Sequence, residues 1–89
     1  MLCDPKWDKP SVAGFRAWLE QQDPEERFNY GSCRYCAVGQ YLDSVGTSWD
    51  QTAGFMVEEL NKFAYRAVLR DNTCLPTFGA VLREIDEAA

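Results

Sequence analysis

The chain has 89 residues, which is enough for one domain with a modest core, because a chain of this size buries roughly 60% of its unfolded surface. Hydrophobic residues make up 46% of it, which excludes intrinsic disorder, and no apolar run is long enough to span a bilayer. Fourteen acids against nine bases give a net charge of −5, and this disfavours direct nucleic-acid binding, which depends on phosphate neutralisation. The charge favours a protein partner with a basic surface.

Residues 1–9 read as an extended arm, because Asp4-Pro5 and Lys9-Pro10 both disfavour helix before the proline. The arm contains no apolar signal segment, so we expect a cytoplasmic protein. In the cytoplasm the four cysteines stay reduced, and disulfides are not expected. The chain has no histidine, which removes the commonest metal ligand and the usual general base near neutral pH.

The first predicted helix runs from Pro10 or Ser11 to Gln22 and carries its apolar residues on one face. Asp23-Pro24 ends it, since the residue before a proline disfavours helical geometry. The connector that follows, residues 23–31, opens with acids and then alternates aromatic with polar residues. This alternation indicates a short extended piece.

Residues 32–46, with the sequence SCRYCAVGQYLDSVG, would be apolar almost all the way round as a helix. Ser32 is its expected N-cap, and Gly46 is its expected C′ residue. Gln40 is expected to bond a neighbouring loop backbone, because a buried amide needs a partner. A helix without a polar face has to be surrounded by the rest of the domain, so we expect this segment at its centre.

The third predicted helix ends near Asp71 and starts either at a capping box from Ser48 or near Phe55. We favour the later start, because the apolar rhythm becomes clean only there. Thr77 is expected to cap a last helix whose end, residues 84–87, is acidic; this end should fray or meet a basic group.

Taken together, the four segments predict an all-α fold. We expect a single domain, residues 1–89, built as a compact bundle of about four helices around the segment 32–46.

The four cysteines suggest three interpretations. Cys33 and Cys36 would lie on one helix face, but a redox pair of this kind belongs to a βαβ context that the sequence lacks. A zinc site would need Cys3 and Cys74 as further ligands, each from its own loop. We therefore favour buried apolar cysteines and no cofactor, with a zinc-stabilised adaptor that uses all four cysteines as an alternative.

The sequence shows no catalytic constellation, since no nucleophile lies beside a base and no glycine-rich phosphate loop is present. An enzyme is not expected. Two surfaces are candidates for partner binding: an aromatic–aliphatic pair with flanking cations outside the third helix, and the acidic connector with the acidic C-terminal turn. The N-terminal arm or the loop 47–54 is the alternative cover for the first surface. The candidate residues are Asp23, Glu25, Glu26, Lys62, Tyr65, Arg66 and Leu69.

The strings FRAWLEQQDP, YGSCRYCAVGQYLDSVG and LPTFGAVLREID together resemble a group of small proteins of phages and prophages. The shared pattern is a Phe-x-x-Trp-Leu helix, a connector with a tyrosine, a Cys-x-x-(Gly/Ala)-Gln-Tyr-Leu segment and a late Thr-Phe-Gly. In this chain the matching residues are Phe15, Trp18, Leu19, Tyr30, Cys36, Gly39, Gln40, Tyr41, Leu42, Thr77, Phe78 and Gly79.

The resemblance implies a phage genomic setting. Small acidic phage proteins of this type are similar to anti-CRISPR and other anti-defence inhibitors, which occupy a host protein. We therefore expect an inhibitor in the host cytoplasm that binds a host protein such as a CRISPR effector subunit, where its acidic face would compete with nucleic acid for a basic groove. The other hypotheses are the zinc adaptor and a homo-oligomeric structural or virion-associated protein.

Overall fold

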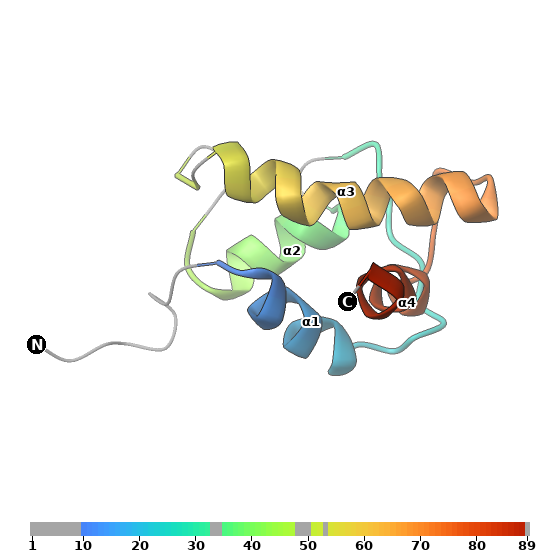
Figure 1. Cartoon of the computed structure of the whole chain (residues 1–89), viewed down its shortest axis with the longest axis horizontal. Helices are drawn as coiled ribbons and strands as arrows, with labels where there is room; N and C mark the ends of the chain where they lie inside the picture. Colours follow the sequence, from blue (N-terminus) through green and yellow to red (C-terminus); the bar gives the residue numbers. More distant parts are fainter. Residues whose placement is uncertain (1–9, 33–34, 48–50, 53, 89) are drawn as a thin grey trace, which may run out of the picture.

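The computed structural model describes residues 10–32, 35–47, 51–52 and 54–88, which form a compact globule of four helices (Figure 1). The predicted all-α fold is confirmed, and the described residues contain no strand, only an isolated antiparallel bridge between Arg27 and Thr77. Within this part of the chain, no helix combines the length and the apolar composition needed to cross a bilayer. The helices are α1 (Val12–Glu20), α2 (Ala37–Ser44), α3 (Gly54–Asp71) and α4 (Phe78–Ala88).

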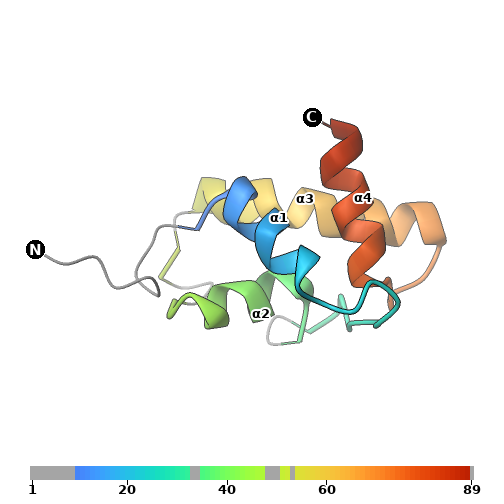
Figure 2. The ribbon, with the colours of Figure 1, turned by 90° about the horizontal axis from the view of Figure 1, so that it is seen from below.

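The longest helix, α3, is crossed steeply by α4, as the two views in Figures 1 and 2 show. α4 packs against α3 and α1, and α2 packs against the same two helices. In Figure 2, α1 lies between α2 and α4. Five of the eight residues of α2 are buried, but Asp43 and Ser44 are exposed. The expectation that all three other helices surround this segment is therefore wrong, because α2 packs mainly against α1 and α3.

The first helix follows its sequence signals closely. Ser11 is the N-cap of α1, and its hydroxyl oxygen accepts a hydrogen bond from the Gly14 N–H at 3.0 Å. The helix ends at Glu20, slightly before the predicted Gln22, and the side-chain amide of Gln22 folds back to donate to the carbonyl of Trp18 at 3.1 Å.

The second helix is shorter than the predicted segment 32–46. It begins at Ala37, because the backbone at Cys36 is extended (ψ 151°) and places this residue at the N-cap. Ser32 instead begins a turn that precedes α2, and its carbonyl oxygen accepts a hydrogen bond from the Cys36 N–H at 2.8 Å. The prediction that Ser32 caps the helix is therefore wrong. Gln40 is only partly buried, and its side-chain amide donates to the carbonyl of Tyr35 at 2.7 Å in the turn just before α2, so its backbone partner is local and does not come from a neighbouring loop.

The end of α2 is the one predicted. Gly46 has a positive φ of 81°, and its N–H donates to the carbonyl of Asp43 at 3.1 Å. The next N–H, of Thr47, donates to the carbonyl of Leu42 at 3.0 Å. These two bonds form a Schellman motif, which requires the left-handed conformation that glycine adopts without strain.

The third helix begins at Gly54, which confirms the later of the two predicted starts. The chain between α1 and α2 contains the predicted extended piece, and its partner is the loop before α4. Three backbone bonds of 3.0 Å join them in one antiparallel register: Phe28 N–H to Pro76 O, Tyr30 N–H to Cys74 O, and Phe78 N–H to Glu26 O. Because Pro76 has no N–H to return, the pairing does not extend into a regular ladder.

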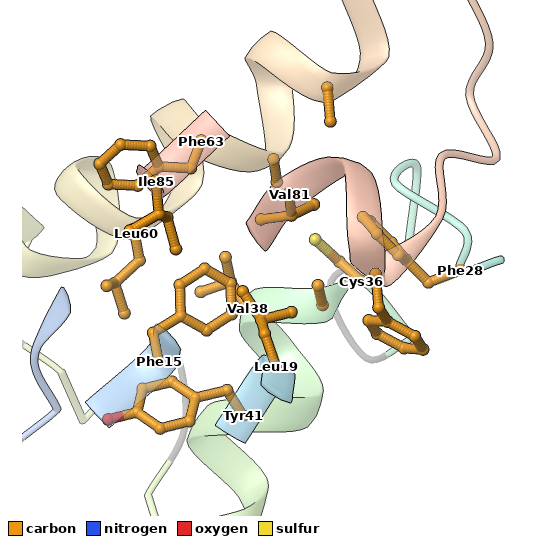
Figure 3. Packing of buried hydrophobic residues seen from close by; sticks show 14 of the residues in the cluster. Phe15, Leu19, Phe28, Cys36, Val38, Tyr41, Leu60, Phe63, Val81 and Ile85 are labelled. Carbon is orange, nitrogen blue, oxygen red and sulfur yellow. The ribbon is translucent and has the colours of Figure 1, made fainter. Parts of the chain in front are cut away.

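The core is a cluster of buried aromatic and aliphatic side chains from all four helices and the connector (Figure 3). The Phe15 ring lies 5.3 Å from that of Tyr41, and the Phe28 ring is stacked on that of Phe78 at 5.2 Å. Trp18 meets Phe78 edge-on at 5.6 Å. The aromatic residues of the Phe-x-x-Trp-Leu and Thr-Phe-Gly motifs are thus packing residues.

The Thr-Phe-Gly motif joins α4 to the connector. Thr77 caps α4, as predicted, by accepting the Ala80 N–H at 3.1 Å on its hydroxyl oxygen. Gly79 donates its N–H to the carbonyl of Pro24 at 3.0 Å, and a Cβ added there would lie 2.7 Å from the same oxygen. Only glycine permits this close approach.

Candidate binding surface

The candidate surface lies on the outer face of α3. Tyr65 and Leu69 are one helical turn apart and are exposed by 49% and 60%, respectively. The buried residues of α3, Leu60, Phe63, Ala64 and Ala67, face the other way. The Tyr65–Leu69 pair is therefore not covered by the described residues.

Tyr30 supports the Tyr65–Leu69 pair from the connector. Its ring centroid lies 6.2 Å from that of Tyr65, with the two planes tilted by 38°. Its hydroxyl oxygen accepts a hydrogen bond from the side-chain amide of Asn61 at 3.1 Å. Tyr30 and Asn61 could not be assigned to this surface from the sequence, because their contact joins positions 31 residues apart.

A third exposed apolar residue of α3 is Phe55, which is 74% exposed. At 100° per residue, it falls within about 80° of both Tyr65 and Leu69 around the helix axis. From the sequence, Phe55 was predicted only as the start of this helix, although the same periodicity also places it on this face.

The cations of α3 form a stripe, since Lys62, Arg66 and Arg70 follow one another at intervals of four residues. Lys62 pairs with Glu59 at 2.7 Å and lies 5.1 Å from the ring centre of Phe63. Arg66 is exposed and makes no hydrogen bond or ion pair with another residue in the described part of the chain. It is the open cation next to the Tyr65–Leu69 pair.

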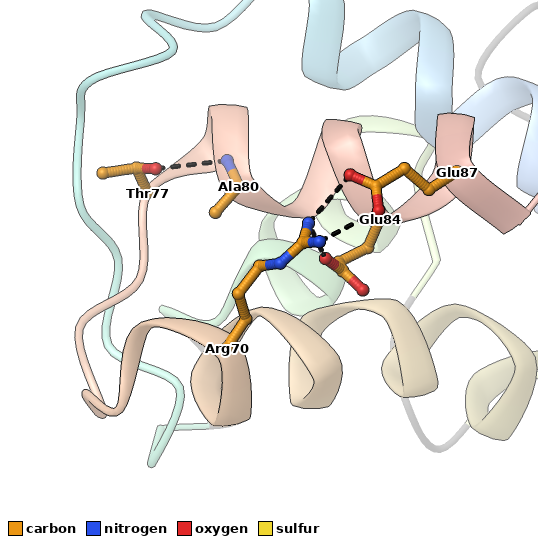
Figure 4. A network of polar contacts seen from close by, with 5 residues as sticks. All are labelled: Arg70, Thr77, Ala80, Glu84 and Glu87. Carbon is orange, nitrogen blue, oxygen red and sulfur yellow. Dashed lines mark hydrogen bonds and ion pairs between the residues drawn. The ribbon is translucent and has the colours of Figure 1, made fainter.

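The acidic end of α4 has basic partners within this chain, which confirms one of the two predicted outcomes. Arg70 reaches from α3 to Glu84 at 2.7 Å and to Glu87 at 2.8 and 2.9 Å (Figure 4). Arg16 on α1 binds Asp86 at 2.6 Å. The hydrogen bond from Arg70 holds the pKa of Glu87 below its usual value. These three carboxylates therefore join α4 to α1 and α3 by ion pairs.

The acids of the connector lie apart from the Tyr65–Leu69 pair. Asp23 accepts the Glu25 N–H on its side chain at 2.9 Å, which is a local turn bond. Glu25 and Glu26 are exposed. Glu25 borders an open groove of about 600 Å³ beside α4. The groove is lined by both acidic and basic side chains, so the groove has no single sign of charge. Its lining residues are Pro24, Glu25, Arg27, Thr77, Gly79, Ala80, Leu82, Arg83 and Asp86.

The cysteines divide by environment. Cys36 lies in the core with 2% of its surface exposed, and Cys74 is exposed in the loop before α4. Cys3 and Cys33, which the zinc hypothesis also needs, lie outside the described residues. Among the residues that are described, no group of three or more histidine, cysteine or acidic side chains is arranged to hold a metal ion.

Comparisons of this chain with protein-family models, with curated proteins and with solved structures give no match. The resemblance to phage proteins stays a prediction from sequence, and the function has to be argued from the surface itself.

Proposed function

We propose that this protein is a non-enzymatic inhibitor that binds a host protein through the Tyr65–Leu69 pair. The proposed target is a protein of the host defence, with a CRISPR effector subunit as the first candidate. The observation that carries this proposal is the exposure of an aromatic and an aliphatic side chain, one turn apart, beside Arg66, which has no partner among the described residues. Tyrosine and arginine are enriched among residues whose removal weakens protein interfaces most.

The neighbourhood of Tyr65 favours binding because it reduces the entropy lost on association. The ring already rests against that of Tyr30, whose hydroxyl is held by Asn61. Immobilising a free side chain at an interface costs about 0.5–1.5 kcal/mol, and a ring that is already packed on one side loses less. A partner would cover the outer side of Tyr65 together with Leu69.

A plaque assay in a bacterial host whose CRISPR system targets the infecting phage tests the proposal. Expression of the full chain is expected to restore plaque formation, and Tyr65→Ala and Leu69→Asp are expected to abolish this effect. Tyr35→Ala is the matched control, because Tyr35 is also exposed, by 61%, and lies outside α3. Circular dichroism of each variant confirms that the fold is retained.

Two results would overturn the proposal. One is plaque formation that stays unaffected by the wild-type chain across hosts with different defence systems. The other is an effect that survives Tyr65→Ala and Leu69→Asp in variants that remain folded. Self-association that depends on Leu69, measured by light scattering, would favour the homo-oligomeric protein instead.

A further inference from the structure

The net charge of the chain and the charge beside its candidate surface have opposite signs. The acids at the end of α4 are bound to Arg70 and Arg16, and Asp23 is engaged in a turn. Directly beside Tyr65, Arg66 is a cation without a partner in the described part of the chain. An exposed acid, Glu58, shares this face of α3 but lies about two turns before Tyr65. A partner chosen from the net charge would be basic, whereas the cation next to the pair favours an acidic group opposite it.

The position of Arg66 in α3 makes its missing partner more significant. Lys62 and Arg70 are its neighbours at i−4 and i+4, and like charges at this spacing repel on a helix. Both neighbours are already matched, Lys62 by Glu59 and Arg70 by two glutamates of α4. Of the three cations in this stripe, Arg66 is the one whose guanidinium group makes no hydrogen bond to a described residue. A free guanidinium group can bind a carboxylate through two parallel hydrogen bonds.

We infer that the partner presents a carboxylate to Arg66 and apolar side chains to Tyr65 and Leu69, so its contact surface is acidic and apolar. This inference rests on the proposed function and deepens it by stating the chemistry of the partner. It replaces the acidic-face mode of action expected from sequence, because charge complementarity at the exposed pair requires the opposite sign.

The test selects randomised 16-residue peptides, displayed on phage particles, against the immobilised full chain. Enriched peptides are then synthesised with a fluorescent label, and binding is measured by polarisation. We expect enriched sequences that combine Asp or Glu with Leu, Phe or Trp. Arg66→Glu and Tyr65→Ala should each weaken their binding at least tenfold, as is usual for hot-spot residues.

A charge exchange and a matched control make the test specific. A peptide whose acids are replaced by lysine should bind Arg66→Glu better than it binds the wild type. Arg83→Gln is the control, because Arg83 is also an exposed arginine but lies on α4, beside the groove. Its affinity for the acidic peptide should stay within about twofold of the wild-type value, since surface substitutions away from the contact have little effect.

The outcomes separate this inference from the function on which it rests. Basic peptides whose binding requires Tyr65 would overturn the acidic partner and leave the binding surface in place. Binding that ignores both Tyr65 and Leu69, or no enrichment at all, would overturn the inference and the surface together. A dimer that Arg66→Glu dissociates would assign the surface to a second copy of the chain and would also overturn the acidic partner.

Discussion

Replacing Gly79 by alanine should destabilise the protein, although alanine is the better helix former. The added Cβ would lie 2.7 Å from the carbonyl oxygen of Pro24 and 3.0 Å from its Cβ. Pro24 cannot move away freely, because this oxygen accepts the Gly79 N–H and the neighbouring connector bonds the start of α4. The clash therefore has to be relieved by breaking or stretching that pairing.

The magnitude follows from two opposing effects. Forcing an extra methyl group into a filled site costs typically about 1–3 kcal/mol. The gain in helix propensity from glycine to alanine is at most about 1 kcal/mol and is smaller in a first turn. We expect a net loss of about 1–2 kcal/mol, and each kcal/mol lowers the Tm of a domain of this size by roughly 4–8 °C.

Gly54→Ala is the matched control, because it makes the same change in the first turn of α3. No atom lies within 4 Å of the added Cβ, and Gly54 does not have a positive φ. It should stabilise the protein by about 0.4–1 kcal/mol, since alanine reduces the entropy of the unfolded chain. Thermal unfolding followed by circular dichroism measures both variants. A Gly79→Ala protein as stable as the wild type would refute the close-approach argument.

Three further predictions concern the packing of α4 and α3. Thr77→Ala should cost about 1 kcal/mol of unfolding free energy in urea titrations because the N-cap bond is lost, whereas Thr77→Ser should retain most of the stability. Leu60→Ala should cost about 2–5 kcal/mol, because Leu60 is fully buried; a smaller loss would contradict its place in the core. The pKa of Glu87 is lowered in the folded protein, so its contribution to the free energy of unfolding is complete above its unfolded pKa and is lost as the pH falls through the lower folded pKa. Arg70→Gln should therefore make the free energy of unfolding less sensitive to acid. Equal dependence of this free energy on pH in the wild type and in Arg70→Gln would exclude the bond.

The sequence was sufficient where local patterns decide the structure. The ends of α3, the Thr77 cap and the left-handed Gly46 follow from side-chain periodicity and from the chemistry of single residues. The start of α2 does not follow from such patterns. Ser32 suits an N-cap, but the extended backbone of Cys36, whose side chain lies in the core, delays the start of the helix to Ala37. Such a tertiary effect leaves no mark in the local sequence.

The candidate surface was also only partly predictable. Periodicity alone places Tyr65 and Leu69 opposite the buried arc of α3, and the structure shows both exposed. The contact of Tyr30 with Tyr65 could not be derived, since it depends on how the connector pairs with the loop before α4. The arginine partners of the α4 acids are equally non-local, and Arg16 and Asp86 are 70 positions apart.

The most direct test of the account asks what lies against α3 inside the host cell. A photo-crosslinking benzoylphenylalanine replaces Leu69 in the full chain, and a second protein carries it at Tyr35 as a control. After irradiation of defence-competent cells, mass spectrometry identifies the attached proteins. We predict that one host protein is crosslinked through position 69 and is absent from the position 35 control. Position 69 joined to no protein, or to the same set of proteins as position 35, would contradict it.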